Sequence, residues 1–239
     1  MLINRIDNEG GRTMTKMVQC KLNGEHEIIL PEHRANREEW YSKSGWEKKR
    51  LKHMKKNIKK GDVVMYVGAE EGDMCGIVAT WGAELIMFEP NNKVLPNIKA
   101  IWKANKLPAA KIYYGFASNL TNDTSAFIST DDIEGEVIHD HGFKELSFAG
   151  NIPQIKIDDV EKIPDFISID VEGSEWQVLR GAEETLRKHK PQIYLSLHPE
   201  FIHEQYGEWG AELRDWLIKL GYTETLIDYP LHEVHLHYA

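Results

Sequence analysis

Short apolar runs alternate with amphipathic stretches from residue 61 onward. The run at residues 63–67 has the composition of a strand that is covered on both faces. Residues 73–81 then show a helical pattern, with Asp73 as the expected N-cap and Gly82 as the expected stop. The same criteria predict further strands at residues 85–88, 112–116, 166–169 and 193–197, and further helices near residues 94–105, 176–186 and 213–220.

This order of elements predicts the fold class. Strands that alternate with helices form a mostly parallel sheet with right-handed crossovers and with helices on both faces. Residues 222–227 and 234–238 flank Tyr229 and Pro230 as a closing antiparallel pair of strands would. We therefore expect a doubly wound α/β fold, Rossmann-like in its architecture, with an antiparallel pair of strands at the end.

The first part of the chain has a different pattern. Residues 16–30 alternate around Asn23 and Gly24, which predicts a β-hairpin. Residues 36–59 have the pattern of a basic amphipathic helix. We interpret its lysines as a solvated face rather than as a polyanion site. The buried side of this helix is expected to consist of Trp46, Leu51, Met54 and Ile58.

These patterns suggest a simple domain organisation. We expect an N-terminal extension over residues 1–60, made of a flexible leader, the hairpin and the basic helix, and one main domain over residues 61–239. The leader lacks the apolar core of a secretory signal. Residues 119–151 are polar, irregular and long for a connection, which favours a lid or a substrate loop.

Composition excludes several classes of function. The net charge of −9 argues against a nucleic-acid backbone as the main partner. No apolar stretch is long enough to span a bilayer, so no membrane partner is expected. Cys20 and Cys75 are far apart and lack metal-ligand spacing, which indicates a reducing, cytoplasmic setting rather than a disulfide framework.

The strand ends predict where a ligand binds. In doubly wound sheets, ligands occupy the crevice at the carboxyl ends of the strands. That rule places the following residues along one crevice: 68–72, Glu89, Phe116, Ala117, Ser118, Asp170 and His198.

The first turn of this crevice carries the most specific signal. Gly68 and Gly72 bracket a tight strand-to-helix turn, and Glu89 follows at the spacing of a carboxylate that accepts ribose hydroxyls. Glu70 and Glu71 lie inside the turn and would repel a pyrophosphate, whereas they favour a ligand with positive charge. S-adenosylmethionine carries an ammonium and a sulfonium and no phosphate. A plain structural turn and a surface glutamate are the alternatives.

A second acidic segment follows the fourth predicted strand. Asp170 lies at the strand end, where a carboxylate in a ligand crevice needs a partner. Glu172 is a candidate for chemistry or a favourable helix-start residue, and Glu175 fits the helix start better. His198 is either a general base for a hydroxyl nucleophile or a hydrogen-bonded structural histidine.

The remaining histidines give a weaker signal. His235 and His237 project from the same face of the last strand, with His232 nearby, and could bind a metal ion. Histidines on a terminal strand are more often residues of its polar face, so no metal site is expected.

These motifs resemble the FkbM-type family of S-adenosylmethionine-dependent methyltransferases, which have the class I methyltransferase fold. The resemblance runs from about Trp46 to Pro199. It rests on the segments GDVV and VGAEEG, FEP at Glu89, Asn97 and Asn105, Phe116-Ala117-Ser118, Ile157-Asp158-Asp159, DFISIDVEGSE, VLRGA at Val178, and the strand from Pro191 to His198.

The resemblance implies a seven-stranded sheet with an antiparallel final pair, and methylation of hydroxyl groups of sugars or small natural products. It implies S-adenosyl-L-methionine as cofactor, with Glu89 on the ribose. We assign catalysis to Asp170 first, His198 second and Glu172 third. The predicted cofactor contacts are Tyr66, Gly68, Ala69, Glu70, Gly72, Glu89, Ala117, Ser118 and Asp170.

Three positions depart from the family pattern. Where this chain has Tyr66, the family usually has Asp. Where this chain has Ser168 and Ser196, the family often has Lys and Glu, respectively. These changes favour, as an alternative, a protein that binds S-adenosylmethionine without methyl transfer and acts as a sensor or assembly partner. A nicotinamide-dependent oxidoreductase is the third hypothesis, and the acidic turn disfavours it.

Overall fold

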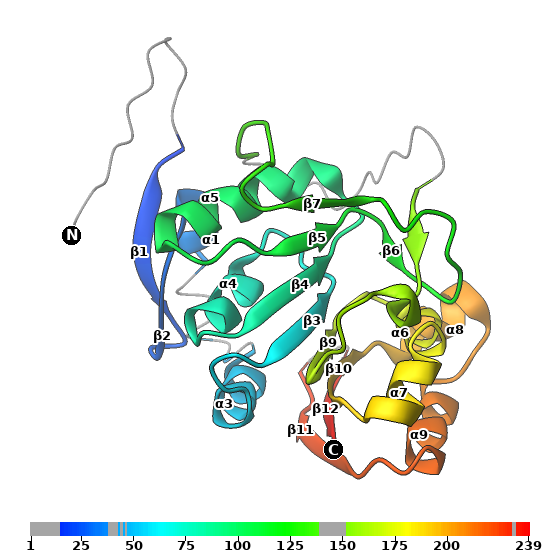
Figure 1. Cartoon of the computed structure of the whole chain (residues 1–239). Coiled ribbons are helices and arrows are strands. Elements are labelled where there is room, and N and C mark those ends of the chain that lie inside the picture. Colours follow the sequence, from blue (N-terminus) through cyan, green and yellow to red (C-terminus); the bar gives the residue numbers. More distant parts are fainter. Residues whose placement is uncertain (1–14, 38–42, 44, 46, 139–151, 231–232) are drawn as a thin grey trace.

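An eight-stranded sheet forms the centre of the computed structural model (Figure 1). The model describes residues 15–37, 43, 45, 47–138, 152–230 and 233–239. The strands lie in the order β11 (Glu224–Asp228), β12 (Val234–Tyr238), β10 (Gln192–Leu197), β9 (Phe166–Ile169), β3 (Val63–Val67), β4 (Glu84–Phe88), β5 (Lys111–Tyr113) and β7 (Phe127–Ser129).

The strand directions confirm the doubly wound α/β fold. The inner strands β5, β4, β3, β9 and β10 pair in parallel. β12 is antiparallel to both of its neighbours, so the predicted antiparallel pair is present. β7 adds an eighth, antiparallel strand beside β5, where the sequence predicted an irregular segment. At three residues, β7 is too short for alternation to be recognised, and its pairing with β5 defines it.

Helices cover both faces of the sheet, as Figure 1 shows. One face carries α3 (Lys48–Asn57), α4 (Asp73–Thr80) and α5 (Leu95–Asn105). The other carries α6 (Glu175–Arg180), α7 (Glu183–His189), α8 (Pro199–Tyr206) and α9 (Gly210–Lys219). Each face has its own cluster of buried apolar side chains, because successive strand residues point to opposite faces. None of the helices in the described ranges combines the length and the apolarity that crossing a membrane requires.

The N-terminal hairpin is part of the first apolar layer. β1 (Met17–Leu22) and β2 (His26–Pro31) pair around Asn23 and Gly24, both of which have positive φ, as predicted. Leu22 and Leu30 are fully buried. The Asn105 side chain on α5 accepts a hydrogen bond from the Ile29 backbone N–H at 2.8 Å and donates one to the Ile29 carbonyl at 2.7 Å. The hairpin is therefore fixed to α5 through backbone groups.

Some predicted boundaries are wrong. The helix predicted over residues 36–59 is interrupted: Lys43 is helical, Gly45 is not, and α3 begins at Lys48 after Glu47, which has a positive φ of 57°. Trp46 and residues 38–42 lie outside the described residues. The N-cap of α4 is Gly72 rather than Asp73, whose carboxylate pairs with an arginine instead.

Two predicted elements are each divided in the structure. Residues 112–116 split into β5 and β6 (Phe116–Ala117), and β6 pairs with β8 (Gln154–Ile155) in a separate small sheet. The helix predicted near residues 176–186 is α6 and α7, separated at Gly181, where a Cβ would overlap the Ser118 carbonyl. Helix α8 was not predicted. Single turns of 3₁₀-helix, η1 (Asn92–Val94) and η2 (Ile157–Asp159), precede α5 and β9, and a one-turn helix α1 (Glu32–Ala35) follows β2.

Candidate active site

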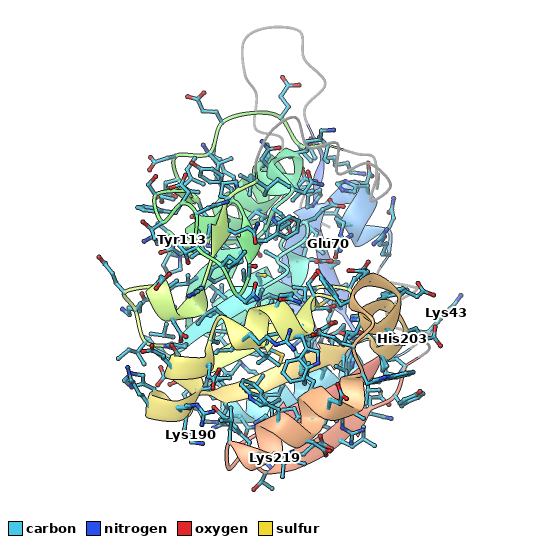
Figure 2. All side chains as sticks on the ribbon, turned by 90° about the vertical axis from the view of Figure 1, so that its right-hand side faces the viewer. Lys43, Glu70, Tyr113, Lys190, His203 and Lys219 are labelled. Atoms are coloured by element: carbon cyan, nitrogen blue, oxygen red, sulfur yellow. The ribbon has the colours of Figure 1, made fainter. Side chains whose placement is uncertain are left out.

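The order of the strands reverses at the centre of the sheet, between β3 and β9. From these two neighbours the chain continues to β4 and β5 on one side and to β10 on the other. A loop that follows β3 therefore lies at the topological switch point, where doubly wound folds bind ligands. In Figure 2, Glu70 of this loop lies well above Lys190 and Lys219, which are near the lower edge of the molecule.

The turn after β3 is tight, and its glycines have structural reasons. Gly68 and Gly72 both have φ of 88°, and Glu70 has φ of 51°. A Cβ on Gly68 would overlap the carbonyl oxygen of Asp170, so this glycine lets the ends of β3 and β9 touch. The backbone N–H groups of Gly68 and Ala69 both donate to the Phe88 carbonyl. Close packing thus explains the glycines, and it brings the two predicted site segments together.

Glu89 joins the turn to the end of β4. It is 7% exposed, and its carboxylate accepts hydrogen bonds from the Glu70 N–H at 2.7 Å and the Asn91 N–H at 2.8 Å. Burial raises its pKa to about 7, against the opposing effect of these two hydrogen bonds. Each carboxylate oxygen has a second acceptor site, so Glu89 can still accept hydroxyl groups from a ligand.

The acidic turn is partly neutralised by a residue that sequence reasoning missed. Arg34, on the one-turn helix after the hairpin, is fully buried and pairs with Glu70, Glu71 and Asp73. His33 Nε2 lies 2.6 Å from the second oxygen of Glu71. Because Arg34 is already bound to three carboxylates, it is not available to a phosphate. The turn keeps an excess of negative charge.

A second buried arginine lies beside the end of β9. Arg50, on α3, donates to the Ser168 hydroxyl at 2.9 Å, to Glu47 at 3.1 Å and to Asp170 at 3.3 Å. Its guanidinium lies next to Tyr66, whose pKa is raised by burial despite this positive charge. Arg50 shares a helix face with Leu51 and Met54, and this position among lysines is the sequence signal that could have identified it.

Asp170 is the accessible carboxylate of this group. Its side chain is 31% exposed, whereas those of Glu47 and Glu233 are each 3% exposed and that of Glu175 is fully buried. It touches the Gly68 turn through its carbonyl and Arg50 through its carboxylate. It lies 3.9 Å from His198 Nε2. The structure therefore brings Asp170 and His198 together, as predicted from the strand ends.

His198 is held by three carboxylates. Its Nδ1 lies 2.7 Å from Glu175 Oε1, and its Nε2 lies 3.4 Å from Glu233 Oε2. Burial would lower the pKa of His198, but the hydrogen bond to Glu175 and the nearby negative charges raise it to about 9. Glu175, expected only as a helix-start residue, thus orients the imidazole.

Other predicted residues lie at the margin of this cluster. Glu172 is exposed and has a positive φ of 48°, and its carbonyl accepts a hydrogen bond from Gln205. Ala117 belongs to the small sheet, and Ser118 donates to Gln154 at 2.8 Å. Within the described residues, the hydrogen bonds of Ala117 and Ser118 connect these two residues to the small sheet rather than to the turn after β3.

Two of the C-terminal histidines contact different groups. His235 and His237 share a strand face, as expected, with His235 Nε2 at 3.3 Å from Glu47 and His237 Nε2 at 2.8 Å from Gln192. His232 lies outside the described residues. A shallow hollow of about 110 Å³ lies near Val160 and Thr185, at the opposite ends of the strands, and shares no residue with this cluster.

Comparison with known proteins identifies the family. A model described as the methyltransferase FkbM domain matches residues 62–223, about two thirds of the chain. The chain belongs to the FkbM methyltransferase family. This confirms the resemblance seen in the DVEG and VLRGA segments. No curated protein sequence matches the chain.

Solved methyltransferase structures are similar to this chain at low sequence identity. Methyltransferase FkbM from Methylobacillus flagellatus KT superposes with a TM-score of 0.54 and 18% identity over 77% of this chain. This chain spans 44% of the length of that one. An rRNA methylase from Streptococcus thermophilus has a TM-score of 0.48 and 7% identity over 79% of this chain and 91% of its own. A precorrin-6y C5,15-methyltransferase from Geobacter metallireducens GS-15 has a TM-score of 0.45 and 12% identity over 80% of this chain and 86% of its own.

Within this family, the arginine on α3 bears on one of the departures noted above. FkbM-type proteins often have Lys where this chain has Ser168. Here the Arg50 guanidinium binds the Ser168 hydroxyl and Asp170 directly. The positive charge is therefore present beside Asp170, although it comes from a helix instead of the strand.

Proposed function

We propose that this protein is a methyltransferase that uses S-adenosyl-L-methionine to methylate a hydroxyl group on a sugar or small natural product. Family membership supports the reaction class. The observation that carries the proposal is Asp170, a partly exposed carboxylate at the switch point, in contact with the Gly68 turn and held by Arg50.

The residues around the turn fit the cofactor. Glu89 offers buried acceptor oxygens for ribose hydroxyls. The acidic excess of Glu70, Glu71 and Asp73 over Arg34 suits a cationic ligand and disfavours a pyrophosphate. We assign the cofactor contacts to this turn, to Glu89 and to Asp170. When bound, S-adenosylmethionine supplies a methyl group that is already a good electrophile.

The protein then has to position and deprotonate the acceptor. Asp170 can accept a hydrogen bond from an acceptor hydroxyl and take its proton, since its carboxylate reaches solvent. Arg50 fixes the orientation of that carboxylate. Among the predicted catalytic residues, Asp170 therefore remains the first choice, with His198 as its neighbour.

Calorimetry and turnover together test this proposal. S-adenosylmethionine should bind the full-length protein, and Asp170→Asn should reduce turnover by about 10²- to 10⁴-fold while weakening cofactor binding by a much smaller factor, because the turn and Glu89 keep their contacts. Absence of binding at high micromolar cofactor would refute the proposal. An unchanged rate in Asp170→Asn would remove this residue from the mechanism.

A cofactor-binding protein without methyl transfer is the second candidate. It is favoured by Tyr66, which is buried beside Arg50 where the family usually has Asp. This candidate predicts cofactor binding without methyl release to any hydroxylated acceptor, so detected turnover would exclude it. Thermal protection by NAD, but not by S-adenosylmethionine, would instead indicate an oxidoreductase.

A further inference from the structure

Glu233 is a buried carboxylate before β12. It is 3% exposed, and among the described residues neither of its carboxylate oxygens has a hydrogen-bond partner. Its Oε2 lies 3.4 Å from His198 Nε2 and 3.2 Å from His235 Nε2. A buried carboxylate normally accepts several hydrogen bonds, because the cost of removing it from water is otherwise not offset. Glu233 therefore faces two imidazoles but accepts no hydrogen bond from the described residues, so a cation at this position would offset the cost of burying its charge.

The strand directions explain why Glu233 lies here. β12 runs antiparallel to β10, and Leu197 pairs with Val234. The residue before β12 therefore meets the residue after β10, which is His198. β9 runs parallel to β10, so Asp170 reaches the same edge. Asp170, His198 and Glu233 offer one ligand atom each, and these atoms lie within 4.8 Å of one another.

We propose that Asp170, His198 and Glu233 bind one divalent transition-metal ion. Imidazole nitrogen with two carboxylates is a donor set suited to ions such as Mn²⁺ or Zn²⁺. The partial exposure of Asp170 leaves an entry path for the ion and an open side for a further ligand.

The distance between His198 and Glu233 fits a coordination shell better than an ion pair, and the longer distance between His198 and Asp170 would have to shorten. A charged imidazole that donates to a carboxylate brings the two atoms to about 2.7–2.9 Å. Here His198 Nε2 is 3.4 Å from Glu233 and 3.9 Å from Asp170. Ligand atoms that share one ion, with bonds of about 2.1 Å, lie about 3.0 to 3.4 Å apart in octahedral or tetrahedral shells. Small side-chain adjustments would bring all three atoms onto one ion.

The other nitrogen of His198 supports the same assignment. Nδ1 lies 2.7 Å from the fully buried Glu175. Metal-binding histidines almost always donate their second N–H to a carboxylate, carbonyl or water, which fixes the ring with its other nitrogen toward the ion. An ion that binds at Nε2 displaces the proton that the surrounding carboxylates otherwise hold on this imidazole. Glu175 is thus a positioning residue, because it acts through His198.

A neighbouring triad is a weaker candidate. Glu47, Glu233 and His235 also bring three ligand atoms within 4.8 Å of one another. Arg50 pairs with Glu47 at 3.1 Å and with Asp170 at 3.3 Å, so its charge does not separate the two candidates. The triad with Glu47 is fully buried, whereas Asp170 is partly exposed and gives an ion a path to the site, so we place the ion on the Asp170 side of Glu233.

Metal titration of the chelator-treated, full-length protein tests the site without any cofactor. Electron paramagnetic resonance should show the signal of free Mn²⁺ disappearing until one ion is bound per chain, and calorimetry should give the affinities for Zn²⁺ and Mg²⁺. We expect Glu233→Gln to weaken Mn²⁺ or Zn²⁺ binding by more than tenfold, and Glu175→Gln to weaken it by about 10- to 100-fold. Glu212→Gln, at an exposed position of α9, is the matched control and should bind as the wild type does.

Either of two results would overturn the proposal. One is the absence of stoichiometric binding up to 1 mM Mn²⁺ or Zn²⁺, on the order of the weakest physiological metal sites. The other is equal affinity in the wild type and in Glu233→Gln. Glu233→Gln keeps the side-chain shape and removes a buried charge, so it should fold. Asp170→Asn, at a partly exposed position, provides a second variant for the same titration.

The ion has a consequence for the proposed function. A hydroxyl group coordinated to a divalent ion loses its proton more readily. Asp170 would then serve the acceptor by holding the ion. This consequence rests on the proposed methyl transfer, whereas the metal titration does not. Metal binding without turnover would support the metal site and refute methyl transfer, so the two proposals can fail separately.

Discussion

At the scale of single residues, the site is governed by buried charges and by the groups that neutralise them. Glu89 accepts hydrogen bonds from two backbone N–H groups, and no cation of the described residues forms an ion pair with it. Arg34 and Arg50, in contrast, each bind several carboxylates. Charges in a dry interior interact strongly, so single substitutions at these positions should have large effects on stability. Removing the charge of Glu89 should favour the folded state, whereas removing the charge of Arg34 or Arg50 should disfavour it.

Glu89 predicts a specific dependence of stability on pH. Its pKa is about 7 in the native state and 4.5 in the unfolded chain. Between these values the native state holds a proton that the unfolded state has lost, so the free energy of unfolding falls as pH rises from 4.5 to 7, by up to roughly 3 kcal/mol. Urea unfolding at pH 5 and pH 8 should show this fall.

The matching variant is Glu89→Gln, which cannot ionise. Its free energy of unfolding should change less between pH 5 and pH 8 than that of the wild type. Part of the change should remain, because burial also raises the pKa of Glu70 to about 7. An unaltered pH dependence in Glu89→Gln would contradict the assignment, and Glu212→Gln should leave it unaltered.

Arg50 predicts a rescue experiment. Arg50→Met should lower the free energy of unfolding by about 3–5 kcal/mol, because Glu47 and Asp170 lose a buried counter-charge. Adding Ser168→Lys restores a cation at the position that the family often uses. We expect the double variant to regain a substantial part of the loss, as measured by urea unfolding. If Ser168→Lys destabilises the Arg50→Met protein further, Arg50 does not replace the family lysine.

At the scale of elements, the hairpin and the turn after β3 depend on a few close contacts. Asn105 satisfies both backbone groups of Ile29, which lies in β2 and thus in the strand that packs on α5. Gly68 lets the turn lie directly against the end of β9. Each contact joins elements that are far apart in the sequence.

Asn105→Ala should loosen the hairpin. The variant leaves two backbone groups of Ile29 without their partners, which should cost about 1–3 kcal/mol. Hydrogen exchange should become faster in β1 and β2 than in β3 and β4. Asn92→Ala, at an exposed position of η1, is the control and should change neither quantity appreciably.

Gly68→Ala tests the close approach of β3 and β9. Gly68 has φ of 88°, and a Cβ there would overlap the Asp170 carbonyl. Gly24 also has a positive φ, but a Cβ there would meet nothing within 4 Å. Gly24→Ala should therefore cost about 1 kcal/mol from backbone strain alone. We expect Gly68→Ala to cost clearly more in thermal unfolding, and equal losses would contradict this account.

At the scale of the whole molecule, the sequence predicted the layers well and the site only in part. Alternating apolar runs identified the strands β3, β4, β9 and β10, because central parallel strands are apolar on both faces. Short edge elements such as β7 carry too few residues for a pattern, and pairing defines them. The boundary between an extension and a main domain at residue 60 stays a prediction, although the hairpin and α3 share an apolar cluster with α4 and α5.

The part of the site that depends on single strand ends was predictable. Glu89, Asp170 and His198 each follow a recognisable strand, and local sequence places them at one edge. Arg34, Arg50 and Glu233 reach the same region from the hairpin segment, from α3 and from the start of β12. Their contacts depend on packing between distant segments, which local sequence does not specify. The place of Arg50 on the buried face of α3 is the one local signal described above.

The antiparallel strand β12 also sets an order of events during protein synthesis. β12 follows both β10 and β11 in the sequence, yet it lies between them in the sheet. A growing chain that has emerged only as far as β11 can therefore align β3, β9 and β10, but the edge of β10 stays open until the next strand inserts. Glu233 reaches His198 together with β12. The nascent chain therefore completes the sheet and the cluster of Asp170, His198 and Glu233 in the same late step.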